Sequence, residues 1–137
     1  MPRSILVVDD DADIRRALIF SLKSLGEVSG SSGGRAALRR IKARAPDLVL
    51  LDIAMPDLDG LSVLRAARMK HPNLVVVMLT GETDLDVAKQ ALELGARTYV
   101  TKPFDLDVVY VEVERLLEER THRSAPPSGR PWRVASP

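Results

Sequence analysis

Short, continuous apolar runs alternate with amphipathic stretches over the first 120 residues. The runs cover residues 5–8, 48–51, 74–79 and 98–100, and a weaker one covers 27–29. Runs of this kind, apolar at nearly every position, are typical of parallel strands that are buried on both faces. A Gly/Ser-rich stretch at 29–34 follows the weak run, so we expect that strand to be truncated and to lie at an edge of the sheet.

Between these runs, apolar positions recur at the spacing of helices. The five stripes are Ile14, Leu18, Leu22 and Leu25; Ala37, Leu38, Ile41 and Ala45; Leu61, Leu64 and Ala67; Val87, Ala88, Ala91 and Leu92; and Val109, Val113, Leu116 and Leu117. Gly26 and Gly95 are suited to end helices, and Asp84 and Asp105 to begin the last two. Strands that alternate with helices predict an α/β fold, a (βα)5 doubly wound five-stranded parallel sheet in a three-layer sandwich.

Length and composition narrow the class of protein. The pattern predicts one domain over residues 1–120, followed at 121–137 by a disordered tail that holds four of the nine prolines and the single tryptophan, Trp132. The absence of cysteine excludes disulfides and thiolate metal ligands. No apolar run is long enough for a signal peptide or a membrane span, so we predict a soluble, cytoplasmic protein. A formal net charge of +1 disfavours direct nucleic-acid binding.

Polar residues follow the predicted strands at the points where the strands end. Asp9 and Asp10 end the first strand, Asp52 the third, Thr80 the fourth and Lys102 the fifth. In a doubly wound sheet these ends meet at one edge. Clustered carboxylates repel one another, and an all-oxygen site that relieves this repulsion favours Mg²⁺. With an ammonium and a hydroxyl beside them, the carboxylates suit an aspartyl-phosphate site.

Other polar residues near the strand ends are explained by structural roles rather than by chemistry at the site. Asp11 and Asp13 suit the N-terminus of a helix, and Asp57 and Asp59 suit a turn before a glycine. His71 is interpreted as a surface residue, and the basic segment 35–44 as a solvated helix face. Tyr99 fits an ordinary half-buried strand residue about as well as a functional one. Trp132, set among arginines, is either a docking motif or part of an unstructured tail.

Four segments together carry a family resemblance. They read ILVVDDD at 5–11, LVLLDIAMPDLDG at 48–60, MLTG at 78–81 and YVTKPF at 99–104. In this order and spacing they resemble the receiver domain of bacterial two-component response regulators, with a flavodoxin-like fold, over residues 4–119. The resemblance implies that Asp52 is the phosphoacceptor and Lys102 its phosphate-pairing partner. It also implies a Mg²⁺ site made by Asp9, Asp10, Asp52 and the backbone carbonyl of Ala54, a switch formed by Thr80 and Tyr99, and a cis Lys102–Pro103 bond.

The resemblance also implies a function. The domain would take a phosphoryl group from a sensor histidine kinase or a phosphotransfer protein in a Mg²⁺-dependent reaction. It would catalyse only its own phosphorylation and dephosphorylation, and would regulate an effector protein through its fourth helix, fifth strand and fifth helix. No output domain follows, so we expect a stand-alone receiver. Arg97 and Thr98 stand where many DNA-binding relatives carry two acids, so we expect a monomer or a weak phosphorylation-dependent dimer.

Three rival functions fit parts of the sequence. A pseudo-receiver would bind partners without taking phosphate, but the intact set of site residues argues against it. A phosphatase of another aspartyl-phosphate superfamily would use Asp9 and Asp11, and the setting of Asp52 and Lys102 fits that poorly. A nucleic-acid binder would use the basic segment 35–44, which the balanced charge disfavours.

Overall fold

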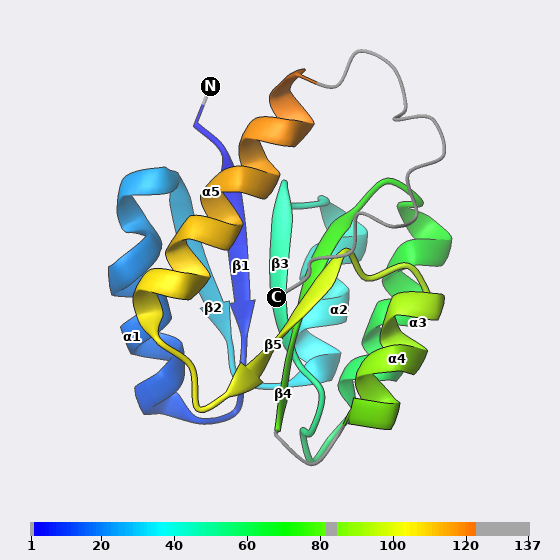
Figure 1. The fold of residues 1–137 in the computed structure, drawn as a ribbon. Helices are drawn as coiled ribbons and strands as arrows, with labels where there is room; N and C mark the ends of the chain where they lie inside the picture. The colour runs from blue at the N-terminus through cyan, green and yellow to red at the C-terminus, as the bar shows by residue number, and fades with distance from the viewer. Residues whose placement is uncertain (1, 82–84, 123–137) are drawn as a thin grey trace.

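The computed structural model contains one five-stranded parallel sheet with helices on both faces (Figure 1). It describes residues 2–81 and 85–122, with side chains up to Glu119. In chain order the elements are β1 (Ser4–Val8), α1 (Ala12–Leu22), the 3₁₀ turn η1 (Lys23–Leu25), β2 (Glu27–Ser31), α2 (Gly34–Ala43), β3 (Leu48–Asp52), α3 (Gly60–Lys70), β4 (Val75–Gly81), α4 (Leu85–Glu93), β5 (Thr98–Lys102) and α5 (Leu106–His122). The predicted (βα)5 fold is confirmed.

The order of the strands fixes where chemistry can take place. They lie in the order β2-β1-β3-β4-β5, and every neighbouring pair is parallel. The chain passes from β1 to the edge strand β2 and then returns across β1 to β3. At such a reversal, the loops after the two strands diverge and leave a crevice at their carboxyl ends. The crevice therefore lies beyond Val8 of β1 and Asp52 of β3.

The sheet separates two apolar cores. Alternate strand residues point to opposite faces, so Leu6, Val49 and Val76 pack beneath α2, α3 and α4. Their sequence neighbours, including Val7 and Leu50, pack beneath α1 and α5. Figure 1 shows these two helical layers on opposite sides of the sheet. Burial on both faces explains why the strands read as continuous apolar runs.

The second strand is the edge strand, as predicted, but it is not truncated at residue 29. It continues through Gly30 to Ser31, in register with Val7 and Val8 of β1. A Cβ at residue 30 would lie 2.9 Å from Cδ1 of Ile19. The glycine thus lies directly under the side chains of α1, while pairing with β1 keeps it in the strand.

The ends of the helices agree with most of the capping predictions. The carboxylate of Asp11 accepts hydrogen bonds from the backbone N–H groups of Asp13 and Ile14 at the start of α1. That of Asp105 accepts from Asp107 at 2.9 Å. Asp84 lies outside the described residues. Helix α5 continues to His122, past the expected boundary at residue 120, and residues 123–137 lie outside the described part of the chain.

His71 is only partly exposed, contrary to its expected place on the surface. Its Nε2 lies 3.0 Å from the carbonyl oxygen of Ile41, and its backbone N–H donates to Ala67 at the end of α3. The side chain therefore links α3 to α2, which places it in a structural role. Among the described helices, none combines the length and the apolar character needed to cross a membrane.

Candidate functional site

The carboxyl edge of the sheet brings three carboxylates together. Asp9 and Asp10 follow β1, and Asp52 is the last residue of β3. Val8 lies beside Leu51 in the β1–β3 register, so the next residue of each strand also lies side by side. Asp9, Asp10 and Asp52 each offer an oxygen within 4.8 Å of the others. The predicted convergence is therefore confirmed for these three residues.

Asp9 is held firmly in a buried position. Its side chain is fully buried, and its backbone N–H donates to the carbonyl of Ser31 at 3.2 Å. Its Oδ1 accepts from the backbone of Asp11 at 3.0 Å, and its carbonyl accepts from Nη1 of Arg15 at 2.8 Å. The sequence reasoning missed Arg15. The available signal was a cation one turn into the helix that follows the acids.

Lys102 joins the two buried carboxylates. Its Nζ lies 3.0 Å from Oδ2 of Asp9 and 3.3 Å from Oδ1 of Asp52. Burial lowers the pKa of Lys102, but the hydrogen bonds and charges of these two acids outweigh it and leave the pKa above its usual value. The ammonium is therefore charged at neutral pH. The peptide bond from Lys102 to Pro103 is cis, as predicted.

Asp52 is 4% exposed, and its negative charge is only partly compensated by its neighbours. Its pKa is raised from 3.8 to about 6: burial raises it most and the charge of Asp9 raises it further, while Lys102 and a backbone hydrogen bond from Ala54 lower it. At neutral pH the carboxylate is mostly ionised. An ionised carboxylate in this position is chemically able to act as an oxygen nucleophile.

The donor set fits a hard divalent cation. Oδ2 of Asp9 is buried and is paired with the ammonium of Lys102 at 3.0 Å. One oxygen from each of the three acids lies within 4.8 Å of the others, so together they could hold Mg²⁺. These acids line a pocket of about 480 Å³ that is also lined by Asp11, Ile53, Ala54, Gly81 and Lys102. Asp10 and Ala54 are exposed at its mouth.

The loop after β3 packs directly against the phosphoacceptor candidate. A Cβ at Gly60 would lie 2.3 Å from the carbonyl oxygen of Asp52, and the N–H of Gly60 donates to Ile53 at 2.7 Å. A residue with a side chain would push α3 away from the site. Asp59 accepts from the N–H of Ser62 and caps α3.

Asp57 does more than form the expected turn. Its carboxylate accepts from the backbone of Gly34 at 3.0 Å and of Arg35 at 3.1 Å, so it caps α2 from a distant loop. These hydrogen bonds hold the pKa of Asp57 below its usual value. The basic segment on α2 is largely exposed, although Arg40 donates to Ser29 and Gly30 at the edge strand.

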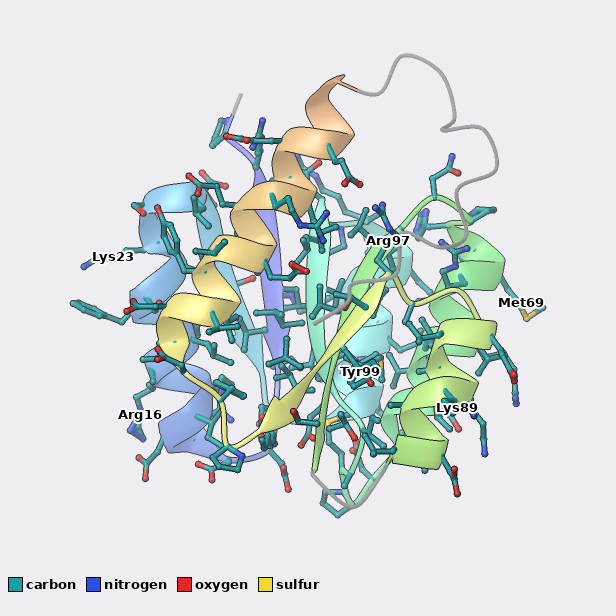
Figure 2. All side chains as sticks on the ribbon, viewed as in Figure 1. Arg16, Lys23, Met69, Lys89, Arg97 and Tyr99 are labelled. Carbon is teal, nitrogen blue, oxygen red and sulfur yellow. The ribbon has the colours of Figure 1, made fainter. Side chains whose placement is uncertain are left out.

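Neither Thr80 nor Tyr99 is among the described residues that line the pocket, although Thr80 directly precedes Gly81, which does. Thr80 is buried and its hydroxyl donates to the carbonyl of Gly81, whereas Tyr99 is 37% exposed on β5 (Figure 2). In the β4–β5 register Tyr99 pairs with Met78 and Thr80 with Thr101. Alternation along the strands places both side chains on the face covered by α2, α3 and α4. They are therefore diagonal neighbours on adjacent strands.

Comparison with known proteins agrees with this geometry. Residues 5–114 match the model of the response regulator receiver domain. The DNA-binding transcriptional regulator NtrC of Escherichia coli K12 is 38% identical over 128 residues, which cover 92% of this chain and 27% of that protein. The transcriptional regulatory protein PrrA of Mycobacterium leprae is 40% identical over 117 residues, which cover 85% of this chain and 50% of that protein.

A solved structure gives the same result. The receiver domain of NtrX from Brucella abortus superimposes with a TM-score of 0.77 at 40% identity, covering 83% of this chain and 98% of that one. The chain therefore belongs to the family of response regulator receiver domains. It spans about a quarter of the length of NtrC, the relative with the longer match.

Proposed function

We propose that this domain accepts a phosphoryl group on Asp52 from a phosphorylated histidine and transmits the event through its surface. One observation carries the proposal: Asp52 lines a strand-end pocket, with Lys102 at 3.3 Å and oxygens of two further acids within 4.8 Å. A buried carboxylate with a pKa raised to about 6 is costly for the fold. That cost is understandable if the carboxylate is a nucleophile.

The transfer follows from the positions of the side chains. An oxygen of Asp52 forms the new O–P bond while the bond from phosphorus to the donor's imidazole nitrogen breaks, and the electron pair goes to that nitrogen. Lys102 can leave Asp9 and pair with a phosphoryl oxygen. Asp9, Asp10, Asp52 and the carbonyl of Ala54 would hold Mg²⁺, which neutralises charge on the phosphoryl oxygens. The domain catalyses only reactions of its own carboxylate, including later hydrolysis.

Thr80 and Tyr99 suit a response to the new charge. The hydroxyl of Thr80 is bonded to a neighbouring carbonyl at 3.3 Å, a long and replaceable hydrogen bond. Turning it toward a phosphoryl oxygen would vacate space that Tyr99 can fill from the same face of the sheet. The surface of α4, β5 and α5 would change with it. A nearly complete switch requires about 5.5 kcal/mol of differential stabilisation.

The partners follow from this chemistry. The donor is a histidine kinase or a phosphotransfer protein, and the receiver of the signal is an effector protein. Direct binding to nucleic acid is not part of the proposal, although relatives such as NtrC are DNA-binding regulators. A monomer or a weak phosphorylation-dependent dimer stays our prediction for the oligomeric state.

Intact-mass measurement after incubation with acetyl phosphate tests the proposal. We expect one added phosphoryl group that requires Mg²⁺ and disappears in Asp52→Ala. Asp13→Ala is the matched control, because Asp13 is an exposed acid outside the pocket. A short-lived phosphate could escape this measurement, so beryllofluoride, a stable mimic, is tested in parallel.

The second measurement separates a receiver from a pseudo-receiver. Beryllofluoride with Mg²⁺ should raise the melting temperature of the wild type and of Asp13→Ala, and leave that of Asp52→Ala unchanged. If the wild type gains neither a phosphoryl group nor stability from beryllofluoride, the pseudo-receiver replaces our proposal. Continuous turnover of phosphate esters would instead indicate the phosphatase.

A further inference from the structure

Helix α5 presents an apolar patch to solvent. Val108 and Val111 are 56% and 60% exposed, and their spacing of three residues places them on adjacent parts of one helix surface. Other exposed apolar side chains on the helices differ in setting. Phe20 has the ammonium of Lys23 4.2 Å from its ring centre, and Met69 points away from α3 (Figure 2).

The same surface of α5 is acidic. The helix contains five acids and two arginines, and Asp107, Glu114 and Glu118 share a stripe with Val111 at a spacing of four, three and four residues. Arg115 pairs with Glu112 and Glu119. Glu114 and Glu118 take part in none of the ion pairs among the described residues. The surface therefore offers two valines bordered by free negative charge.

The segment that follows α5 has the complementary chemistry. Residues 123–137 contain three arginines and no acid, and the only tryptophan of the chain, Trp132, lies between Arg130 and Arg133. An aromatic ring flanked by cations matches an apolar patch flanked by acids. The charge of this segment is thus opposite to that of the helix it extends.

The length of the segment is sufficient for it to reach the patch. Val108 lies 14 residues before the end of α5 at His122, which corresponds to about 21 Å of helix. Trp132 lies 10 residues beyond His122, which spans up to about 33 Å when extended. With Trp132 at the two valines, a chain that runs antiparallel to α5 places Arg130 about one turn further along, near Glu114. Arg133 then lies on the side of Asp107.

We propose that residues 123–137 fold back along α5, with Trp132 packed on Val108 and Val111, Arg130 beside Glu114 and Arg133 beside Asp107. The covered surface belongs to the region through which a receiver would contact its effector. The segment then competes with that partner and limits access to α5. This contact needs no phosphorylation, so it stands or falls independently of the proposed reaction of Asp52.

The fluorescence of Trp132 tests the contact directly, because no other tryptophan contributes. In the full chain we expect a blue-shifted emission and an acrylamide quenching constant lower by about a factor of two than in a peptide of residues 121–137, since a packed indole is shielded from water. The double variant Val108→Ser, Val111→Ser and the charge variant Asp107→Asn, Glu114→Gln should both raise quenching toward the peptide value. Met69→Ser, which changes an exposed apolar residue on α3, is the matched control and should change nothing.

Three different fluorescence results would each contradict the proposed contact. Quenching of the full chain equal to that of the peptide would show that Trp132 does not pack. Protection that survives both α5 variants, or that Met69→Ser removes, would place the contact elsewhere. Protection that disappears after about a hundredfold dilution would show that the occupant of α5 is a second copy of the chain, because only an intermolecular contact depends on concentration.

Discussion

At the scale of single residues, the balance of charge around Asp52 determines how the metal-free protein behaves. Asp9 and Asp52 are both buried, and one ammonium, Lys102, serves them both. The pKa of Asp52, about 6, indicates that one cation does not compensate two buried carboxylates. The folded state therefore holds a proton on Asp52 more tightly than the unfolded state does.

This shift predicts that Asp52→Asn stabilises the metal-free protein at neutral pH. An acid whose pKa is raised on folding makes stability fall as pH increases from about 4 to about 6. A neutral amide avoids this loss, so we expect a gain of about 3 kcal/mol at pH 7.5 that shrinks toward zero near pH 4. Urea unfolding at both pH values in the presence of a chelator measures the difference. Equal stability of variant and wild type at pH 7.5 would contradict the electrostatic explanation.

At the scale of elements, helix starts depend on carboxylates, and one of these comes from far along the chain. Asp11 and Asp59 cap the helices that follow them. Asp57 instead caps α2, which begins 23 residues earlier, through hydrogen bonds to Gly34 and Arg35. The loop that carries Asp57 follows β3, so this contact ties α2 to the loop beside the pocket.

Asp57→Ala should lower the melting temperature at neutral pH. The pKa of Asp57 is depressed by its backbone hydrogen bonds, so its stabilising effect is present above the ordinary pKa of an aspartate. It is lost as pH falls through the lower pKa of the folded state. Thermal unfolding from pH 7 to pH 3 should show wild type and variant converging in acid. Asp13→Ala, which removes an exposed acid, should stay close to the wild type, and a pH-independent loss in Asp57→Ala would argue against the cap.

Some features of these elements depend only on neighbouring residues in the sequence, and others on contacts between distant segments. The strand ends and the cluster of three acids could be predicted, because buried parallel strands and polar residues directly after them leave a continuous pattern. The length of β2 could not be predicted, because its Gly/Ser-rich composition is unfavourable for a strand. Pairing with β1 and the position of Gly30 beneath Ile19 outweigh that composition. The capping by Asp57 and the support of Asp9 by Arg15 depend on contacts between separate segments.

At the scale of the whole molecule, binding of a cation should couple to folding, because the three carboxylates meet only when β1 and β3 are paired. We expect Mg²⁺ to raise the free energy of unfolding, by about 1.4 kcal/mol for each tenfold increase above the dissociation constant. Asp10→Asn should weaken this response and Asp13→Asn should retain it, as measured by urea unfolding in a Mg²⁺ series at constant ionic strength. The same response in both variants would show that Mg²⁺ acts nonspecifically.

The sheet separates the two apolar cores, so a substitution in one core affects stability independently of a substitution in the other. Leu18 belongs to α1 and Leu64 to α3, and they pack in different cores on opposite sides of the strands. Because distant sites without shared partners contribute independently to stability, substitutions in one layer need no compensation in the other. The layer of α2, α3 and α4 and the layer of α1 and α5 can therefore diverge at separate rates during evolution, and an engineer can repack one while the other continues to hold the strands in place.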